Sequence, residues 1–474
     1  MATIYGANSV SGYDVANSVR LNSGDSPYMH KVKSSNDEVS TATFSAWVKR
    51  SKLGANQRIV SHMTNGFADY FYFRFNSSDV FEFAFKGSAN NIVWTTNRLF
   101  RDVSAWYHIV ARVDTTDGTA GNRVRIYVNG VQETSFSAST NPDQNETFSI
   151  GTTSDPIVVG GLYGSGYGIS SGSTSEHFGG YIAELVVCEG QSLAPTSFGE
   201  FDEDSPTIWR PIDVSGLTFG TNGFYLDFED SSNLGNDANG GTDLTEANIA
   251  ATDQSIDTCT NNFATLNSAV LLTDVTLSEG NLKAAFGSAS SRSPAGATLA
   301  PTSGKWYYEL KLIASSTGNY IAAGYADIYA NGTQLGNYTT AGSLGFGINA
   351  WDGTVVNRTS TTTASPGNFA ITPDDILGVY LDIDNLQHTF TLNGTQHSTG
   401  YDAITASTTG FYIATIGDGG GSQTISAEIN FGSPPFAISS SNTDANGYGN
   451  FEYSPTIGGV NFYALNSKNL AEFG

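Results

Sequence analysis

The sequence predicts an all-β fold with two antiparallel β-sandwich domains joined by a loop-rich connector. Short runs of alternating apolar and polar residues recur along the chain, and this period of two is typical of strands with one buried face. The 474 residues include 53 glycines, while charged residues make up only 14%, which favours many short strands joined by turns over helices. No amphipathic helix longer than two or three turns can be traced in the sequence.

The clearest element is a strand–loop–strand unit at residues 106–130, which reads AWYHIVARVD, a polar loop and RVRIYVNG. One face of the two strands carries Tyr107, Ile109, Ala111 and Val113, followed by Val124, Ile126 and Val128. Asn129-Gly130 tolerates the positive φ angles of a tight hairpin turn, so a third short strand is expected from Val131.

The first domain is predicted to span residues 1–200, and further alternating runs lie on both sides of this unit. In TATFSAWVKRS, Phe44, Ala46 and Val48 form one face and Trp47 the other. In HFGGYIAELVVCEG, the alternation predicts that Tyr181, Ala183 and Leu185 face the core.

Residues 201–268 are acidic and rich in turns, with one clear strand at residues 224–228. Trp209, Phe219 and Phe263 are too apolar for a free linker, so an ordered connector packed on the first domain is expected. A disordered stretch at residues 231–257 is the alternative.

The second domain is predicted to span residues 269–474. Trp306, Tyr308, Leu310 and Leu312 form one face of a strand, and ILGVYLDID with HTFTLNG repeats the strand–loop–strand unit, with a turn at Asn393-Gly394. The chain ends in an aromatic segment, GYGNFEYSPTIGGVNFYALNSKNLAEFG.

The charge balance limits the partners. There are 45 acidic and 21 basic residues and a formal net charge of −24, which argues against binding to nucleic acid because phosphates would be repelled. The first residues lack the basic region and apolar run of a signal peptide, and no stretch is apolar enough to insert in a membrane. Cys188 and Cys259 lie in different settings and are expected to be free thiols.

The sequence shows no catalytic pattern. The six histidines are scattered singly, and no metal-protease motif, nucleophile elbow or phosphate-binding loop is found. Carboxylate pairs occur, but an acidic β-protein supplies such pairs by chance. We therefore expect that the protein is not an enzyme.

One loop has the composition of a calcium site. Asp227, Asp230, Asp237 and Asp243 supply hard oxygen ligands in a glycine-bearing segment, so Ca²⁺ is the candidate cofactor. The spacing does not match a helix-flanked calcium loop, and turns built on Asp and Asn side chains would explain the same residues.

Two loops of the second domain are candidates for ligand binding. Aromatic faces stack on sugar rings while charged groups and amides bind hydroxyls, which singles out Trp351, Asp352, Arg358, Tyr401 and Asp402. The alternative is that Trp351 is a buried anchor of its own loop.

The ordered motifs resemble known families. FSAWVKR, AWYHIVARVD, IYVNG and FGGYIAELVV resemble a LamG-type, concanavalin-like jelly roll over residues 15–200, and GKWYYELKL, IAAGYA, DDILGVYLDID and TFTLNG resemble a SPRY domain. The whole order, with the connector and the terminal ALNSKNL, resembles a class of tailed-bacteriophage virion proteins. The LamG resemblance implies packed antiparallel sheets with carbohydrate or protein ligands at a loop rim and, in some members, calcium.

These resemblances imply a virion protein that is assembled in the host cytoplasm and exposed on the particle surface. We expect a non-enzymatic tail fibre or spike adhesin that binds host surface polysaccharide and contacts other virion proteins. A homo-oligomer is expected, with a trimer as one option. The alternatives are a capsid decoration or other virion-surface structural protein and, less favoured, a glycan-degrading enzyme.

Overall fold

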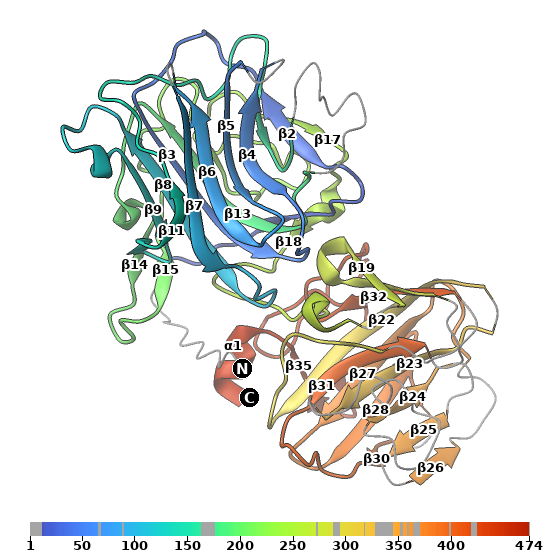
Figure 1. The fold of residues 1–474 in the computed structure, drawn as a ribbon. Coiled ribbons are helices and arrows are strands. Elements are labelled where there is room, and N and C mark those ends of the chain that lie inside the picture. Colours follow the sequence, from blue (N-terminus) through green and yellow to red (C-terminus); the bar gives the residue numbers. More distant parts are fainter. Residues whose placement is uncertain are drawn as a thin grey trace. The chain divides into compact units, whose positions relative to one another are not determined.

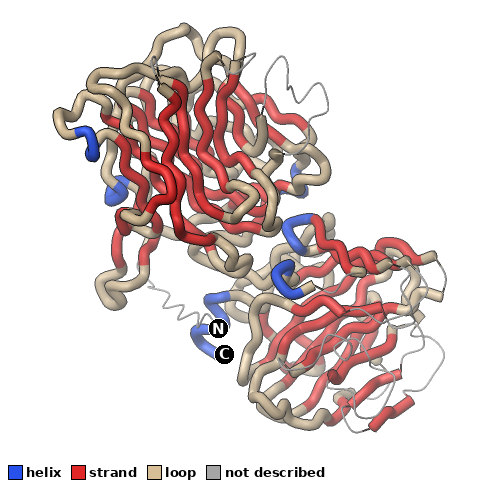
Figure 2. Tube along the Cα trace, viewed as in Figure 1, coloured by secondary structure: helices blue, strands red, loops and turns tan. Residues whose placement is uncertain are grey.

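The computed structural model describes residues 12–64, 68–87, 90–162, 176–271, 274–287, 294–316, 318–327, 345–350, 354–357, 360–363, 370–397, 400–418 and 424–473. The described chain divides into two compact units, residues 12–260 and residues 261–473. Strands dominate both units (Figures 1 and 2), and the predicted all-β fold is confirmed.

The first unit contains two large antiparallel sheets, named here by a central strand. The strands of the β3 sheet, in spatial order, are β10 (Val131–Gln132), β9 (Val124–Val128), β8 (Trp106–Asp114), β3 (Thr41–Arg50), β13 (Gly180–Glu189), β1 (Ser18–Leu21) and β18 (Gln254–Ser255), with β16 (Phe224–Leu226) also paired to β13. Those of the β5 sheet are β11 (Phe136–Ser139), β7 (Asn91–Leu99), β6 (Val80–Lys86), β5 (Tyr70–Phe75), β4 (Gln57–Met63), β12 (Ile157–Val159), β2 (Tyr28–Lys31) and β17 (Thr245–Ala247). A separate hairpin joins β14 (Gly199–Phe201) to β15 (Trp209–Pro211).

Phenylalanine side chains fill the core between these sheets. Phe44 of β3 contacts Phe71 of β5 with ring centroids 4.9 Å apart and Phe83 of β6 at 5.6 Å, and all three are fully buried. The predicted core faces of β3, β8 and β9 are confirmed, because Phe44, Ala46, Val48 and their alternating counterparts lie in one cluster. The predicted turn is present as well, with φ of 48° at Asn129 and 76° at Gly130.

The core face predicted for β13 from its alternating residues is wrong for two of the three residues. Leu185 lies in the core between the sheets, but Tyr181 and Ala183 lie on the opposite face, packed with Trp47, Trp106 and Trp209. The register shifts between Ala183 and Val186, which is a β-bulge, and residues are buried on both sides of this strand. A strand buried on both faces does not show its core side by hydrophobicity alone.

The segment after residue 200 contributes to both sheets of the first unit. Tyr225 of β16 pairs with Val186 of β13, Gln254 of β18 pairs with Val19 of β1, and Glu246 of β17 pairs with Met29 of β2. This segment covers the outer face of the β3 sheet, where Val214, Phe219 and Tyr225, together with Phe198 just before the segment, form a second apolar cluster with Val186 and Cys188.

The second unit is another pair of sheets. The β22 sheet contains, in spatial order, β19 (Val275–Ser278), β20 (Lys283–Phe286), β32 (Ile425–Asn430), β22 (Lys305–Ser315), β27 (Ile376–Asp382), β28 (Gln387–Leu392) and β29 (Thr395–Gln396), with β30 (Asp402–Ala403) beside β28 and β35 (Tyr463–Ala464) beside β22. The β23 sheet contains β21 (Pro294–Gly296), β31 (Ile413–Asp418), β23 (Ile321–Ala326), β24 (Gly345–Asn349), β25 (Thr354–Asn357) and β26 (Ser360–Thr363). A short hairpin joins β33 (Thr456–Ile457) to β34 (Val460–Asn461).

Helical segments are short. The α-helix α1 (Ser467–Phe473) ends the described chain, and the 3₁₀ turns within the described residues include η2 (Ala120–Asn122), η4 (Pro195–Ser197), η5 (Ala251–Asp253), η6 (Ser268–Val270) and η7 (Glu279–Asn281). None of the helices in the described ranges combines the length and the apolar character that crossing a bilayer would require.

The aromatic C-terminal segment packs on its own unit. The carboxylate of Glu309 on β22 is fully buried and accepts hydrogen bonds from the backbone amides of Glu452 at 3.1 Å and Tyr453 at 2.7 Å. Tyr380 donates to the carbonyl of Ser454 at 2.8 Å, and β35 runs parallel to β22. The segment therefore covers an outer face of the β22 sheet.

Candidate functional site

The sequence-predicted ligand residues lie in different settings. Trp351, Asp352 and Arg358 lie outside the described residues. Tyr401 is half-buried and donates to the carbonyl of Ile457 at 3.3 Å. Asp402 lies in β30 opposite His388, and its burial raises the pKa of its carboxyl group. Tyr401 therefore anchors the C-terminal segment.

The predicted calcium ligands are bound to groups of the protein itself. Asp237 is buried, with its carboxylate 3.6 Å from the ammonium of Lys31, and it accepts from the amide of Tyr225 at 3.1 Å. Asp243 accepts from the side chain of Asn233 at 2.8 Å. Asp227 and Asp230 each accept the amide two residues ahead, as in turns built on Asp.

The acidic loop therefore matches the turn interpretation that the sequence left open. In the part of the chain that the structure describes, no group of three or more His, Cys, Asp or Glu residues is placed to hold a metal ion. The calcium prediction gains no support from the described residues.

A cluster of aromatic and charged side chains lies on the outer face of the β5 sheet. On β5, Phe71, Phe73 and Phe75 point into the core, so Tyr70, Tyr72 and Arg74 point outward. Arg58 of β4 and Glu82 of β6 lie opposite Arg74 in the register, and Glu176 lies beside Arg58. We call these six residues the aromatic–charged face; strands β4, β5 and β6 are neighbours in Figure 1.

The two tyrosine rings of this face are nearly parallel. Their centroids are 5.8 Å apart with an interplanar angle of 11°. The guanidinium of Arg74 lies 4.2 Å from the centroid of the Tyr72 ring and that of Arg58 lies 5.1 Å from it. Both arginines thus hold Tyr72 in place through cation–π contacts.

The charges of the face form one chain of ion pairs. Arg74 lies 2.8 Å from Glu82 and 3.4 Å from Glu176, which also pairs with Arg58. Burial alone would raise the pKa of Glu176, but the two arginines lower it below its usual value. Burial, followed by the charge of Glu82, raises the pKa of Tyr72 to about 12. At neutral pH the face therefore presents neutral tyrosines bordered by fixed charges.

This arrangement suits a polar ring-shaped ligand. A tyrosine face accepts the C–H face of a sugar ring, and adjacent guanidinium and carboxylate groups hydrogen-bond hydroxyls. The sequence contained a signal for it, since DYFYFRF alternates phenylalanine with Tyr70, Tyr72 and Arg74. That alternation predicts the outward face of β5, but which residues of β4 and β6 border it depends on the register.

A serine–histidine pair in the first unit lacks the properties of a nucleophile and base. Ser45 Oγ lies 2.8 Å from His108 Nε2, and the indole of Trp209 donates to His108 Nδ1 at 2.9 Å. Because Nδ1 accepts, the proton lies on Nε2, and the imidazole donates to Ser45. Complete burial lowers the pKa of His108 to about 3. This histidine is a core residue.

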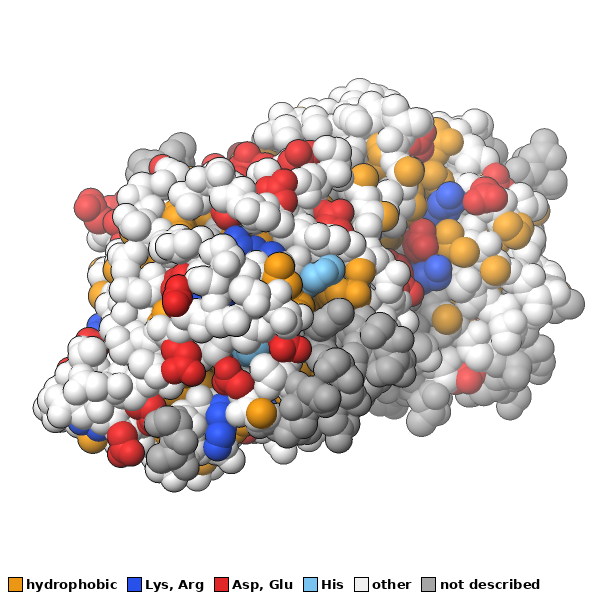
Figure 3. Space-filling model, turned by 90° about the horizontal axis from the view of Figure 1, so that it is seen from above, with side chains coloured by type: hydrophobic (Ala, Val, Ile, Leu, Met, Phe, Trp, Pro, Cys, Tyr) orange, Lys and Arg blue, Asp and Glu red, His pale blue; other side chains and the backbone are white. Residues whose placement is uncertain are grey.

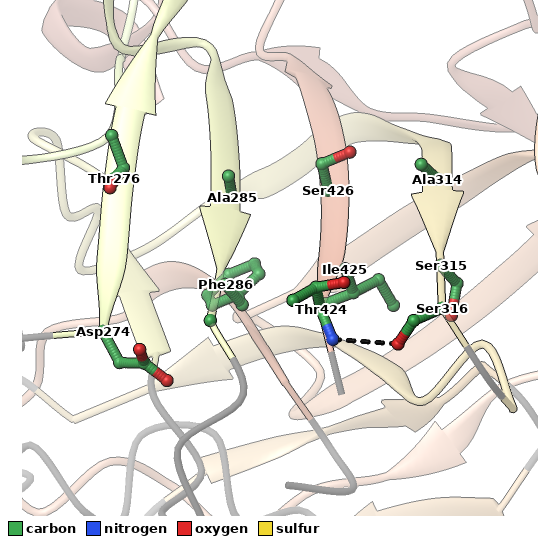
Figure 4. Close-up of a pocket in the computed structure, with 11 residues that line it drawn as sticks. Asp274, Thr276, Ala285, Phe286, Ala314, Ser315, Ser316, Thr424, Ile425 and Ser426 are labelled. Carbon is green, nitrogen blue, oxygen red and sulfur yellow. Dashed lines mark hydrogen bonds between the residues drawn. The ribbon is translucent and has the colours of Figure 1, made fainter. Parts of the chain in front are cut away.

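The second unit has a shallow groove of about 570 Å³ on the β22 sheet (Figure 4). Its floor is a cross-strand row of small side chains in register on four strands, Thr276, Ala285, Ser426 and Ala314. At one end the amide of Thr424 donates to the hydroxyl of Ser316 at 3.0 Å. The groove offers hydroxyl groups but no exposed aromatic ring among its lining residues, and is therefore a weaker sugar platform than the aromatic–charged face.

The fold and this face define an all-β protein with two sandwich units and an outer-sheet surface of aromatic and charged residues. Residues 23–189 match the family model of the concanavalin A-like lectin/glucanases superfamily, and residues 305–433 match that of the SPRY domain. The two matches lie in the first and the second unit, respectively.

Solved structures show distant similarity. The SPRY domain of human HERC1 is 15% identical, with 33% of this chain and 91% of that chain covered and a TM-score of 0.28. A putative carbohydrate binding protein from Bacteroides ovatus is 19% identical, with 49% of this chain and 58% of that chain covered and a TM-score of 0.34. Domains LG4-5 of the mouse laminin alpha1 chain are 12% identical, with 90% of each chain covered and a TM-score of 0.31. A search of curated proteins gave no significant match.

Proposed function

We propose that the protein is a non-enzymatic adhesin on the surface of a tailed-bacteriophage virion and that it binds a host surface glycan. The aromatic–charged face of the first unit is the proposed glycan site. The second unit is proposed to contact other virion proteins. The protein is also proposed to form a homo-oligomer.

The observation that carries the glycan proposal is the pair of parallel tyrosine rings on an outer sheet face. Tyr70 and Tyr72 are both partly exposed, and their rings lie 5.8 Å apart. The guanidinium groups of Arg74 and Arg58 lie over the Tyr72 ring, so the Tyr70 ring is the proposed stacking surface for the apolar side of a sugar, and the charged groups nearby bind its hydroxyls. This face belongs to the unit that matches the concanavalin A-like lectin/glucanases superfamily.

The charges favour a neutral glycan and favour binding over hydrolysis. The protein carries a net charge of −24, so an anionic polymer would be repelled, and acidic side chains are spread over the surface shown in Figure 3. Glycoside hydrolysis needs a carboxyl group that keeps its proton until it donates it to the leaving group. Both carboxylates of the face are paired with arginine, and, against the effect of burial, the two arginines lower the pKa of Glu176, which opposes a proton-donating role for that carboxyl group.

The virion proposal rests on the order of sequence elements. A LamG-like sandwich, an acidic connector, a SPRY-like sandwich and a terminal ALNSKNL resemble a class of phage virion proteins. Immunogold labelling of intact particles tests it: label at the tail tip or fibres supports the adhesin. Label over the head would instead favour a capsid decoration protein.

The glycan site is tested by binding of the full chain to an array of bacterial surface polysaccharides. We expect Tyr70→Ala to weaken binding on the order of tenfold or more, since a stacked aromatic anchor is worth over 1 kcal/mol. Tyr320→Ala is the matched control, because Tyr320 is an exposed tyrosine of the other unit at 37% exposure. If Tyr70→Ala and wild type bind equally well, the aromatic–charged face is not the glycan site.

A further inference from the structure

A lysine and an aspartate far apart in the sequence meet in the interior of the first unit. Lys49 is near the end of β3, and Asp257 follows β18 in the segment that covers the β3 sheet. Lys49 Nζ lies 2.7 Å from Asp257 Oδ2, and each side chain is only 1% exposed. The two residues are separated by 208 positions in the chain.

Aromatic residues enclose the pair. In the β3 sheet Lys49 lies in register between Trp106 of β8 and Tyr181 of β13, and its Nζ lies 5.5 Å from the centroid of the Tyr181 ring. The indole of Trp106 donates to Asp257 Oδ1 at 3.1 Å. Trp47 and Val15 belong to the same buried cluster, so water is excluded from this region.

The backbone of Asp257 is fixed as well. Its carbonyl accepts from the hydroxyl of Ser18 at 2.6 Å, and its amide donates to the hydroxyl of Ser255 at 3.1 Å. The amine and the carboxyl group are therefore held together in one geometry, and reactions between groups held in this way have effective concentrations far above those in solution.

Burial works against the ionised form of this pair. Removing an ammonium and a carboxylate from water costs much of what their attraction returns. Burial lowers the pKa of Lys49, although the charge of Asp257 opposes it. Proton transfer from Lys49 to Asp257 gives a neutral amine, which is a nucleophile, beside a neutral carboxyl group whose Oδ1 is polarised by the Trp106 indole.

We propose that Lys49 and Asp257 condense into an intramolecular isopeptide bond. One ammonium proton moves to the carboxylate, and Nζ attacks Cγ. The Nζ–Cγ bond forms, the Cγ–Oδ2 bond breaks, and Oδ2 leaves as water with a second proton from Nζ. The step needs no oxidant and no co-reactant, and the product amide carries no charge to be buried.

The bond would join the central strand β3 to the last segment of the unit. Such a link closes a loop of roughly two hundred residues. It lowers the conformational entropy of the unfolded chain more than that of the folded chain, which stabilises the fold. The link would also keep the segment with β18 on the sheet when the other contacts of that segment open.

Mass spectrometry tests the proposal on the full-length protein as purified. We expect an intact mass one water lighter than that of the sequence, and a digest with trypsin should give one branched peptide with Lys49 joined to Asp257. An unmodified intact mass, or separate Lys49 and Asp257 peptides with no linked peptide, would overturn it.

Variants identify which two residues are linked, and their readout is a mass rather than the stability of the fold. Asp257→Asn should lose ammonia instead of water, because the amine then displaces the amide nitrogen. Lys33→Arg is the control, since Lys33 makes another buried contact with a carboxylate, 2.7 Å from Glu189, and the mass deficit should remain. A deficit that follows Lys33 and not Lys49 would refute the assignment.

Discussion

Glu184 is predicted to make the first unit less stable as pH rises through neutrality. It lies at the bulge of β13 with a left-handed φ of 48° and is only 5% exposed. Its Oε2 accepts from the hydroxyl of Tyr225 at 2.8 Å and is 3.5 Å from that of Tyr13. Burial raises its pKa from 4.5 to about 8; the hydrogen bond from Tyr225 opposes this, and the nearby charges of Asp227 and Glu229 add to it.

The size of the effect follows from proton linkage. A carboxyl group with a raised folded-state pKa stabilises the fold below its unfolded pKa, and this contribution is lost as pH rises towards the folded pKa. A shift from 4.5 to about 8 is about 3.5 units. At about 1.4 kcal/mol per pKa unit, the free energy of unfolding decreases by about 5 kcal/mol in total. About 3 kcal/mol of this decrease occurs between roughly pH 5.5 and pH 8.5.

The assay is urea unfolding of the full chain followed by tryptophan fluorescence at several pH values. Over this pH range the free energy of unfolding of wild type should decrease by about 3 kcal/mol more than that of Glu184→Gln, because the amide does not titrate. Glu203→Gln, at an exposed glutamate, is the control and should follow wild type. If the difference between wild type and Glu184→Gln stays constant within about 0.5 kcal/mol, Glu184 is not the protonated residue that this reasoning requires.

Three further predictions concern single residues. Glu309→Ala should destabilise the second unit by about 2–4 kcal/mol, because the amides of the C-terminal segment lose a buried acceptor. Limited proteolysis of the variant should then cut after residue 440 first. If this segment is as resistant to protease in the variant as in wild type, Glu309 does not anchor it. Gly130→Ala should cost about 1–3 kcal/mol in thermal unfolding, because its φ is 76° and a Cβ would lie 2.2 Å from the Trp209 ring, while Gly118→Ala, with open space, should be neutral. The imidazole resonances of His108 should not titrate above about pH 4, because burial lowers its pKa to about 3; a midpoint near 6.5 would show that the ring reaches solvent.

The sequence alone determined the β class and most strand faces. Alternation identifies the inward residues of β3, β8, β9 and β22 because each of these strands pairs with neighbours that turn the same side to the core. Asn129-Gly130 and Asn393-Gly394 identify tight turns because their left-handed conformations suit few other residue pairs. These signals are local, and the forces behind them act within a few residues.

The tertiary structure decided what alternation cannot express. Tyr181 and Ala183 face outward because a bulge shifts the register of β13 and a later segment covers its second face. The ion-pair chain around Tyr72 and the contact between Lys49 and Asp257 depend on which strands become neighbours. A pairing between residues 208 positions apart leaves no pattern in either local sequence, because it is the packing of the whole unit that brings the two side chains together.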